Sequence, residues 1–227
     1  MGKNYGAVDH LNMTGSGRPL GTNFYCVRCV PTRAKESANE TNQVGEYDPD
    51  THHSFNEVIR YEAEYVSKVR TEISAIEITT GSGDAMAVES VVLQQENKKY
   101  ARIRMTAHEH PEQNFGEHLD NERTITLPAF LGFGANDHLG VFESELDVQR
   151  SEYNITVGHE DDSNNVGEHL VGRSQGEMHR VTVEAITDEL PDEPTAPWKT
   201  EDRQTPRLNN EQYRASITAS KLVAGPV

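Results

Sequence analysis

Apolar and polar residues alternate with a period of two along most of the chain between Phe55 and Val223. The clearest run has apolar side chains at every second position: Ala101, Ile103, Met105 and Ala107. Successive side chains of a β-strand point to opposite faces of its sheet, so this alternation predicts strands that are buried on one face. No helical stretch longer than two turns is expected, and the predicted fold class is all-β.

The alternating runs are separated by turn-forming residues, which predicts eight or nine short strands. They occupy residues 55–65, 69–78, 85–93, 101–107, 124–133, 142–148, 153–157, 181–185 and 215–219. Eight antiparallel strands suit a jelly roll or a closed barrel. We therefore expect an eight-stranded antiparallel jelly-roll β-barrel.

Residues 1–54 lack this pattern and are rich in glycine, asparagine, threonine and serine. We expect them to form an extended N-terminal arm, and residues 55–227 to form a single jelly-roll domain. A second irregular segment, 190–210, contains four prolines and the only tryptophan, Trp198. It is predicted to be a surface excursion before the last strand that contacts a neighbouring subunit. An arm that buries little surface cannot offset the entropy lost on ordering, so it needs a partner.

The chain carries 37 acidic and 21 basic residues, and only seven of the basic residues are lysine. Such a surface is typical of proteins that stay soluble in high salt, where the Debye length falls to about 3 Å at 1 M. The net charge of −16 argues against direct binding of nucleic acid. A hydrophobic content of 34% predicts a thin core that neighbouring subunits complete. Neither a signal peptide nor a membrane span is recognisable, so we expect the protein to be made and used without export.

The only two cysteines, Cys26 and Cys29, lie in the short apolar stretch of the arm, 24–30. A structural zinc site needs four ligands, and no second cysteine pair exists to supply them. A redox motif would need a βαβ context, which the arm does not offer. Two free thiols, a disulfide within the arm, and a disulfide or contact with a neighbouring subunit are the remaining interpretations. The last would suit an assembly.

The densest group of histidines is His108, His110 and His118. On a strand, His108 and His110 would point to the same face. A jelly roll with a His-x-His strand resembles the cupin enzymes, whose metal site adds a following glutamate and a later histidine. That resemblance implies His108, His110 and Glu112 as ligands, although Glu112 follows His110 sooner than in that family. The alternative is a hydrated loop at the strand end, and we expect neither a metal nor a cofactor.

Other catalytic signatures are incomplete. No Gly-x-Ser-x-Gly motif occurs, and Gly132-Phe-Gly134 lacks the lysine and the helix of a phosphate-binding loop. The acidic segment 158–165 has oxygen ligands suited to a hard cation, but it does not follow the EF-hand order. A solvated run of charges is the other interpretation of this segment. We expect that the protein is not an enzyme.

A barrel-sized β-region with a long arm and a proline-rich excursion is typical of assembly subunits, in which arms tie neighbours together. In length, acidity and strand count, residues 55–223 resemble the single β-barrel major capsid proteins of halophilic archaeal icosahedral viruses with an internal membrane, in particular the larger of the two. The resemblance implies a virion capsid subunit that assembles with copies of itself and a second capsid protein into pseudo-hexameric capsomers. It also implies contacts with minor capsid or membrane proteins beneath the shell. Alternative functions are a cupin-like metal-dependent enzyme and a carbohydrate-binding or host-attachment β-module.

Overall fold

The computed structural model describes residues 6–38, 53–70, 73–80, 86–110, 123–129, 137–142, 147–163 and 169–224. These residues form ten β-strands and no α-helix, so the predicted all-β class is confirmed. Within the same ranges, there is no helix with the length and apolarity needed to cross a bilayer.

The ten strands follow one another along the chain. They are β1 (Phe24–Ala38), β2 (His53–Ser67), β3 (Ile76–Thr80), β4 (Met86–Glu96), β5 (Arg102–Glu109), β6 (Arg123–Leu127), β7 (Val148–Ser163), β8 (His169–Thr187), β9 (Lys199–Gln204) and β10 (Tyr213–Val223). The expected strands 85–93 and 101–107 correspond to β4 and β5. The expected strand 142–148 lies partly outside the described residues.

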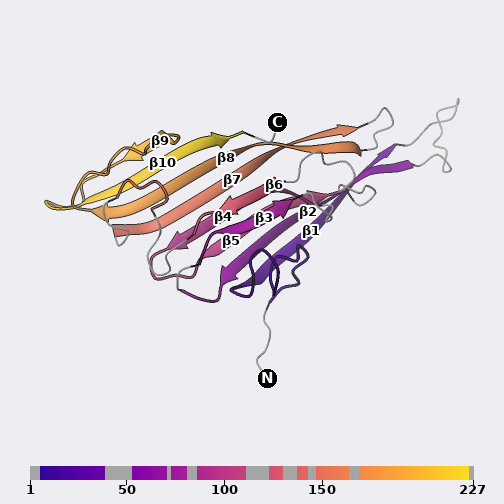
Figure 1. Cartoon of the computed structure of the whole chain (residues 1–227), viewed down its shortest axis with the longest axis horizontal. Helices are drawn as coiled ribbons and strands as arrows, with labels where there is room; N and C mark the ends of the chain where they lie inside the picture. The colour runs from indigo at the N-terminus through magenta and orange to yellow at the C-terminus, as the bar shows by residue number, and fades with distance from the viewer. Residues whose placement is uncertain are drawn as a thin grey trace, which may run out of the picture.

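Eight strands form one antiparallel sheet in the order β1-β2-β5-β4-β7-β8-β10-β9, and β3 pairs with β6 in a separate two-stranded sheet (Figure 1). The small sheet packs on one face of the large one, since Ile78 and Ile125 are buried in the same cluster as Ile103 and Met105. The described molecule is therefore a two-layer β-structure, and β1 and β9 are the edges of the large sheet.

This arrangement differs from the expected jelly roll. A jelly roll distributes its eight strands between two packed sheets, whereas here eight strands belong to one sheet and the second layer has only two. Alternation indicates which face of a strand is buried, but it carries no information on which strands pair. The all-β class was therefore predictable, whereas the membership and topology of the large sheet were not, since β1 and β9 lie outside the expected strands.

The core face of the large sheet follows the predicted period of two. Its fully buried apolar side chains include Phe24, Tyr65, Val88, Val91, Leu93, Ile103, Met105, Val148, Ile155, Val181, Val183 and Ile217. Burying one large apolar side chain contributes about 1.5–3 kcal/mol, so this face supplies much of the stability of the fold. The core lies between this face, the β3–β6 pair and the N-terminal segment.

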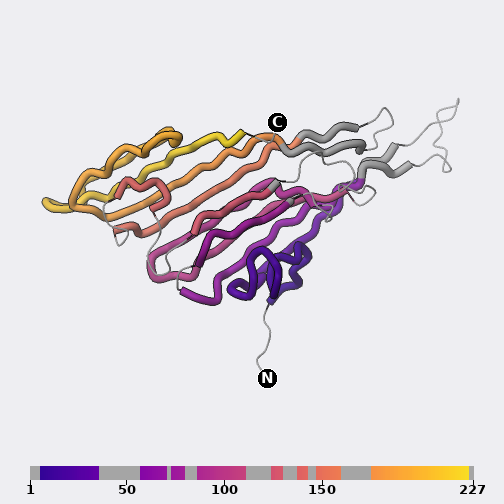
Figure 2. Tube along the Cα trace, in the orientation of Figure 1, coloured from indigo at the N-terminus to yellow at the C-terminus, as the bar shows by residue number. Residues whose placement is uncertain are grey.

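The expected arm is largely part of the fold. Residues 24–38 form the edge strand β1, which pairs with β2 along its whole length. The preceding segment 6–23 folds back beside the start of β1 (Figure 2) and buries Leu11, Met13 and Leu20 in the core. The alternation in β1 was hidden because its register shifts after Cys26, as in a β-bulge.

Two hairpins extend beyond the rest of the large sheet (Figure 1). Among the described residues, 34–38 of β1 pair only with 53–58 of β2, and 158–163 of β7 pair only with 169–176 of β8. We call these two-stranded segments the two ribbons. They leave the same end of the sheet, because β1 and β7 run in the same direction within it. The expected acidic loop 158–165 is therefore strand up to Ser163, and its last two residues lie outside the described ranges.

The predicted excursion, 190–210, contains the edge strand β9, which pairs with β10. Its Trp198 packs against the core, and the Nζ atom of Lys221 lies 4.6 Å from the centre of the indole ring. Arg203 pairs with Glu193 and donates to the carbonyl of Pro191. These contacts are made within the chain, where a contact with a neighbour was expected.

Candidate functional site on the open face of the sheet

The face of the large sheet opposite the core is lined by polar and charged side chains, and we call it the open face. Its arginines are Arg28, Arg60, Arg102, Arg104, Arg150, Arg180 and Arg214. Its carboxylates are Glu62, Glu64, Glu96, Glu152, Glu184, Glu201 and Asp202. Cations and carboxylates are thus nearly equal in number here, although the whole chain has a net charge of −16.

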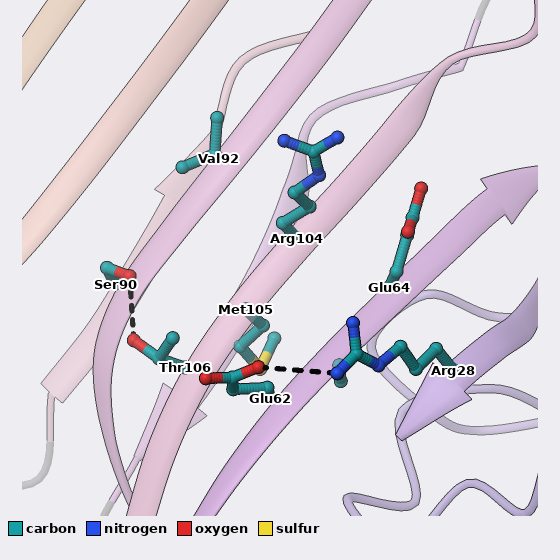
Figure 3. A pocket seen from close by; sticks show the side chains of 9 residues that line it. Arg28, Glu62, Glu64, Ser90, Val92, Arg104, Met105 and Thr106 are labelled. Atoms are coloured by element: carbon teal, nitrogen blue, oxygen red, sulfur yellow. Dashed lines mark hydrogen bonds and ion pairs between the residues drawn. The ribbon is translucent and has the colours of Figure 1, made fainter. Parts of the chain in front are cut away.

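A hollow of about 390 Å³ lies on the open face where β1, β2, β5 and β4 run side by side (Figure 3). It is lined by Arg28, Glu62, Ala63, Glu64, Ser90, Val92, Arg104, Met105 and Thr106. Antiparallel pairing brings these residues together, because Glu64 is opposite Arg104 and Arg104 is opposite Val92 in the ladders. The half-buried apolar side chain of Val92 lies beside Arg104 at one side of the hollow (Figure 3).

The carboxylates of the hollow differ in how firmly they are held. Glu64 accepts a hydrogen bond from Arg102 at 2.9 Å, whereas Glu62 lies 3.8 Å from Arg28 and its side chain is 72% exposed. Among the described residues, the guanidinium of Arg104 has no ion-pair partner, and Figure 3 shows it extending away from the Arg28–Glu62 pair. The hollow therefore presents one unpaired cation and one weakly paired carboxylate.

Ion pairs connect charged side chains over the rest of the open face, both within β7 and between neighbouring strands. Arg150 contacts Glu152 at 3.0 Å and Glu184 at 3.8 Å, and Arg214 also contacts Glu184 at 3.4 Å. Such exposed pairs contribute little individually to stability, typically below about 1 kcal/mol. They do fix the positions of charges, which suits the recognition of another charged surface.

The predicted metal ligands do not form a metal site among the described residues. The rings of His108 and His110 lie edge to face with centroids 5.6 Å apart, and His159 lies 5.4 Å from His108 in the same way. His108 Nδ1 is 2.9 Å from Glu89 Oε1, and this hydrogen bond lowers the pKa of Glu89. Glu112 lies outside the described residues.

Cys26 and Cys29 are both free thiols in this structure. Cys26 is buried and its Sγ atom lies 3.9 Å from the carbonyl oxygen of Val8. Burial, followed by the charge of Asp9, raises the pKa of Cys26 to about 11, and burial also raises the pKa of Cys29. A thiolate is needed for exchange or metal binding, so both thiols are poorly suited to either reaction in the folded chain.

A buried polar network that was not predicted lies on the core face. His179 Nε2 is 2.6 Å from Glu177 Oε2, and His179 Nδ1 is 2.8 Å from the hydroxyl of Tyr153. A neutral imidazole satisfies both contacts when Nε2 donates to Glu177 and Tyr153 donates to Nδ1. Burial and the charge of Glu177 raise the pKa of Tyr153 to about 12. The alternation of β8 could have revealed this, because Glu177 and His179 are in phase with the buried Val181.

The hollow itself was not predicted, because it needs Arg28 of the unrecognised strand β1 beside β2. The exposure of Arg102 and Arg104 did follow from alternation, since both lie out of phase with the apolar residues of β5. Comparisons of the sequence with protein-family models and with curated proteins find no match.

Proposed function

We propose that the protein is a structural subunit of a multi-copy assembly. The observation that carries this proposal is the pair of ribbons at one end of the sheet, 34–38 with 53–58 and 158–163 with 169–176. In the part of the chain that the structure describes, each ribbon continues for five or more residues per strand beyond the point where a third strand pairs with it.

A two-stranded ribbon is at best marginally stable in water, because it has no further strand or layer on which to bury side chains. Two such ribbons leaving one end in the same direction are therefore well suited to contact other subunits. Sheet extension along β1 is less suited to this role, because Pro31 lacks an N–H group and the register shift after Cys26 distorts the edge.

The base of each ribbon is anchored to the body of the molecule. In the first ribbon, the nearly buried carboxylate of Glu57 lies 2.6 Å from Lys35 Nζ and 3.5 Å from Arg33 Nη1. In the second, His159 Nε2 lies 2.8 Å from the carbonyl oxygen of Val88 on β4. Fixed bases give the ribbons a defined direction, which a connecting element needs in order to place neighbours regularly.

The specific form of the proposal is a capsid subunit of a halophilic virus, assembling with copies of itself and a second capsid protein. The acid-rich, lysine-poor composition supports the high-salt part of this proposal. The ribbons support the assembly part. The eight-stranded sheet is not the two-sheet jelly roll on which the capsid resemblance rested, so the capsid form of the proposal rests on the high-salt and assembly features and not on topology.

The test is to shorten each ribbon and measure assembly. Joining Ala34 to Val58, which are opposite each other, through an Asn-Gly turn removes the first ribbon, and the same turn between Val157 and Glu177 removes the second. The control shortens the loop 205–212, which joins β9 to β10 at the opposite end of the sheet. Particle size is measured by light scattering and electron microscopy in about 3 M and about 0.1 M salt.

We expect the wild-type chain and the loop control to form large particles in high salt, and the ribbon variants to keep their sheet spectrum while failing to assemble. Dilution of salt should loosen the particles, because repulsion between acidic subunits is then less screened. Wild-type protein that stays a small oligomer at every salt concentration, with its expected capsid partner absent or present, would overturn the proposal.

A further inference from the structure

We propose that the open face is a self-association surface, on which a second copy of this chain packs face to face about a two-fold axis. This inference rests on the proposed function and names one contact within the assembly. The axis lies in the plane of contact and passes midway between Arg104 and Glu62. Each Arg104 is then opposite Glu62 of the partner subunit.

The composition of the open face fits such a contact. It holds half of the chain's fourteen arginines, and the strands β2, β5, β4, β7 and β8 contain no lysine at all. Arginine is enriched and lysine depleted at protein interfaces, because a planar guanidinium loses less entropy per hydrogen bond and is more weakly hydrated.

Charge complementarity selects a second copy as the occupant. Two chains that each carry −16 repel one another over most of their surfaces, but the open face is locally balanced, with arginines and carboxylates on neighbouring strands. A two-fold contact pairs each residue with a different residue of the other copy, so a face bearing both signs can be complementary to itself. A polyanion would gain less, because the carboxylates of this face would repel it.

The hollow identifies the pair at the centre of the contact. Arg104 has no ion-pair partner among the described residues, and Glu62 has only the 3.8 Å contact with Arg28. Glu64 is a poorer candidate because Arg102 already donates to it at 2.9 Å. The half-buried Val92 beside Arg104 supplies apolar surface to the same contact.

The size of the face is adequate for a stable dimer. The six neighbouring strands β2, β5, β4, β7, β8 and β10 are together about 24 Å across. Eight residues of a strand such as β5 extend about 27 Å. This is close to the roughly 800 Å² per partner that a standard interface buries.

The test uses two charge reversals, Arg104→Glu and Glu62→Arg, each of an exposed side chain. Sedimentation in about 0.15 M salt measures dimerisation of the wild type and of each variant. Lys98→Glu at the β4–β5 turn and Glu77→Arg on β3 are exposed controls with the same changes in net charge. An isotope-labelled Arg104→Glu chain is then mixed with an unlabelled Glu62→Arg chain, and native mass spectrometry counts the mixed dimers.

We expect each single variant to dimerise on the order of ten- to a hundred-fold more weakly than the wild type, because equal charges then meet across the axis. The mixture should restore dimers as mixed pairs, since glutamate at 104 meets arginine at 62 and Glu62 meets Arg104. The two controls should dimerise like the wild type. Restoration by mixing cannot arise from contacts within one chain.

Several outcomes would overturn the inference: a wild type that is monomeric at all concentrations, variants that dimerise like the wild type, or a mixture that forms no mixed dimers. Retention of monomeric wild type, but not Arg104→Glu, on a polyanion resin would assign the face to an anionic polymer instead. Dimers that form without larger particles would support this inference while counting against the proposed function. Large particles that still form when either charge is reversed would support the proposed function and count against this inference.

Discussion

The hydroxyl of Tyr65 donates a hydrogen bond to Asp9 Oδ1 at 2.9 Å, and this contact ties the N-terminal segment to the core face of β2. The other carboxylate oxygen, Asp9 Oδ2, accepts from the backbone N–H of Thr14 at 2.8 Å and from its hydroxyl at 2.9 Å. One carboxylate therefore shapes the turn of segment 6–23 and fastens it to a fully buried tyrosine. The segment thereby becomes part of the folded unit.

Replacing Asp9 by alanine should lower the free energy of unfolding by about 2–3 kcal/mol, because three hydrogen bonds are lost. Tyr65→Phe removes only one of them and should cost about 1 kcal/mol. Urea denaturation followed by circular dichroism measures both. Tyr25→Phe is the matched control, since Tyr25 is 41% exposed. Equal stability of Asp9→Ala and wild type would mean that the segment does not contribute to the cooperative unit.

At the base of the first ribbon, removing the cationic partners of Glu57 should cost more stability than neutralising the Glu57 carboxylate itself. The double variant Arg33→Ala, Lys35→Ala leaves Glu57 nearly buried without a cation and should cost about 3 kcal/mol. Glu57→Gln leaves two cations that already contact water and should cost about 1 kcal/mol or less. Thermal unfolding of both variants checks the order. An equal loss in the two would show that Glu57 is solvated in the folded state.

The strands that could be predicted are those with one buried face. In β5, Ile103 and Met105 are buried and Arg102 and Arg104 face outward, as the alternation of the sequence indicates. The edge strand β9 escaped prediction because none of its residues is buried, so no apolar period marks it. The order of strands depends on pairings between distant residues, which a local pattern cannot encode.

In the candidate site, too, the features set by local alternation were predictable, and those set by strand pairing were not. The outward direction of Arg104 is a local property of β5 and was predictable. Its position beside Glu62 and Arg28 requires β5 to pair with β2, and β2 with β1. Cys26 and Cys29 were expected on a free arm, and their burial follows from the unpredicted incorporation of that stretch into the sheet.

Burial of Cys26 predicts slow thiol chemistry in the folded chain. With its pKa raised from 9.0 to about 11, the thiolate fraction at pH 8 is about a hundred-fold smaller than in the unfolded chain. In the Cys29→Ser variant, labelling of Cys26 by a thiol reagent should therefore be at least about a hundred-fold slower under native conditions than in denaturant. Cys26→Ser reports Cys29 in the same way, and Cys29 should be labelled faster than Cys26 because its side chain is only partly buried. Rapid native labelling of Cys26 would contradict its burial.

Partial burial of His138 predicts that acid destabilises the fold between pH 6.5 and about 4. The ring lies edge to face with Tyr153, and desolvation lowers its pKa from 6.5 to about 4. The unfolded chain therefore binds a proton near pH 6.5 that the folded chain binds only near pH 4. Within this window the unfolded state carries the extra proton, so stability falls as the pH falls, by about 1.4 kcal/mol per unit.

His138→Gln removes this contribution, so the unfolding free energy of the variant should change less steeply across the window than that of the wild type, by up to about 3 kcal/mol in total. Urea denaturation at pH 7, 6, 5 and 4 measures both slopes. His10→Gln, at an exposed position, controls for the loss of an imidazole as such. Identical slopes for His138→Gln and wild type would contradict the burial of His138, because only a ring withdrawn from water resists protonation over this range.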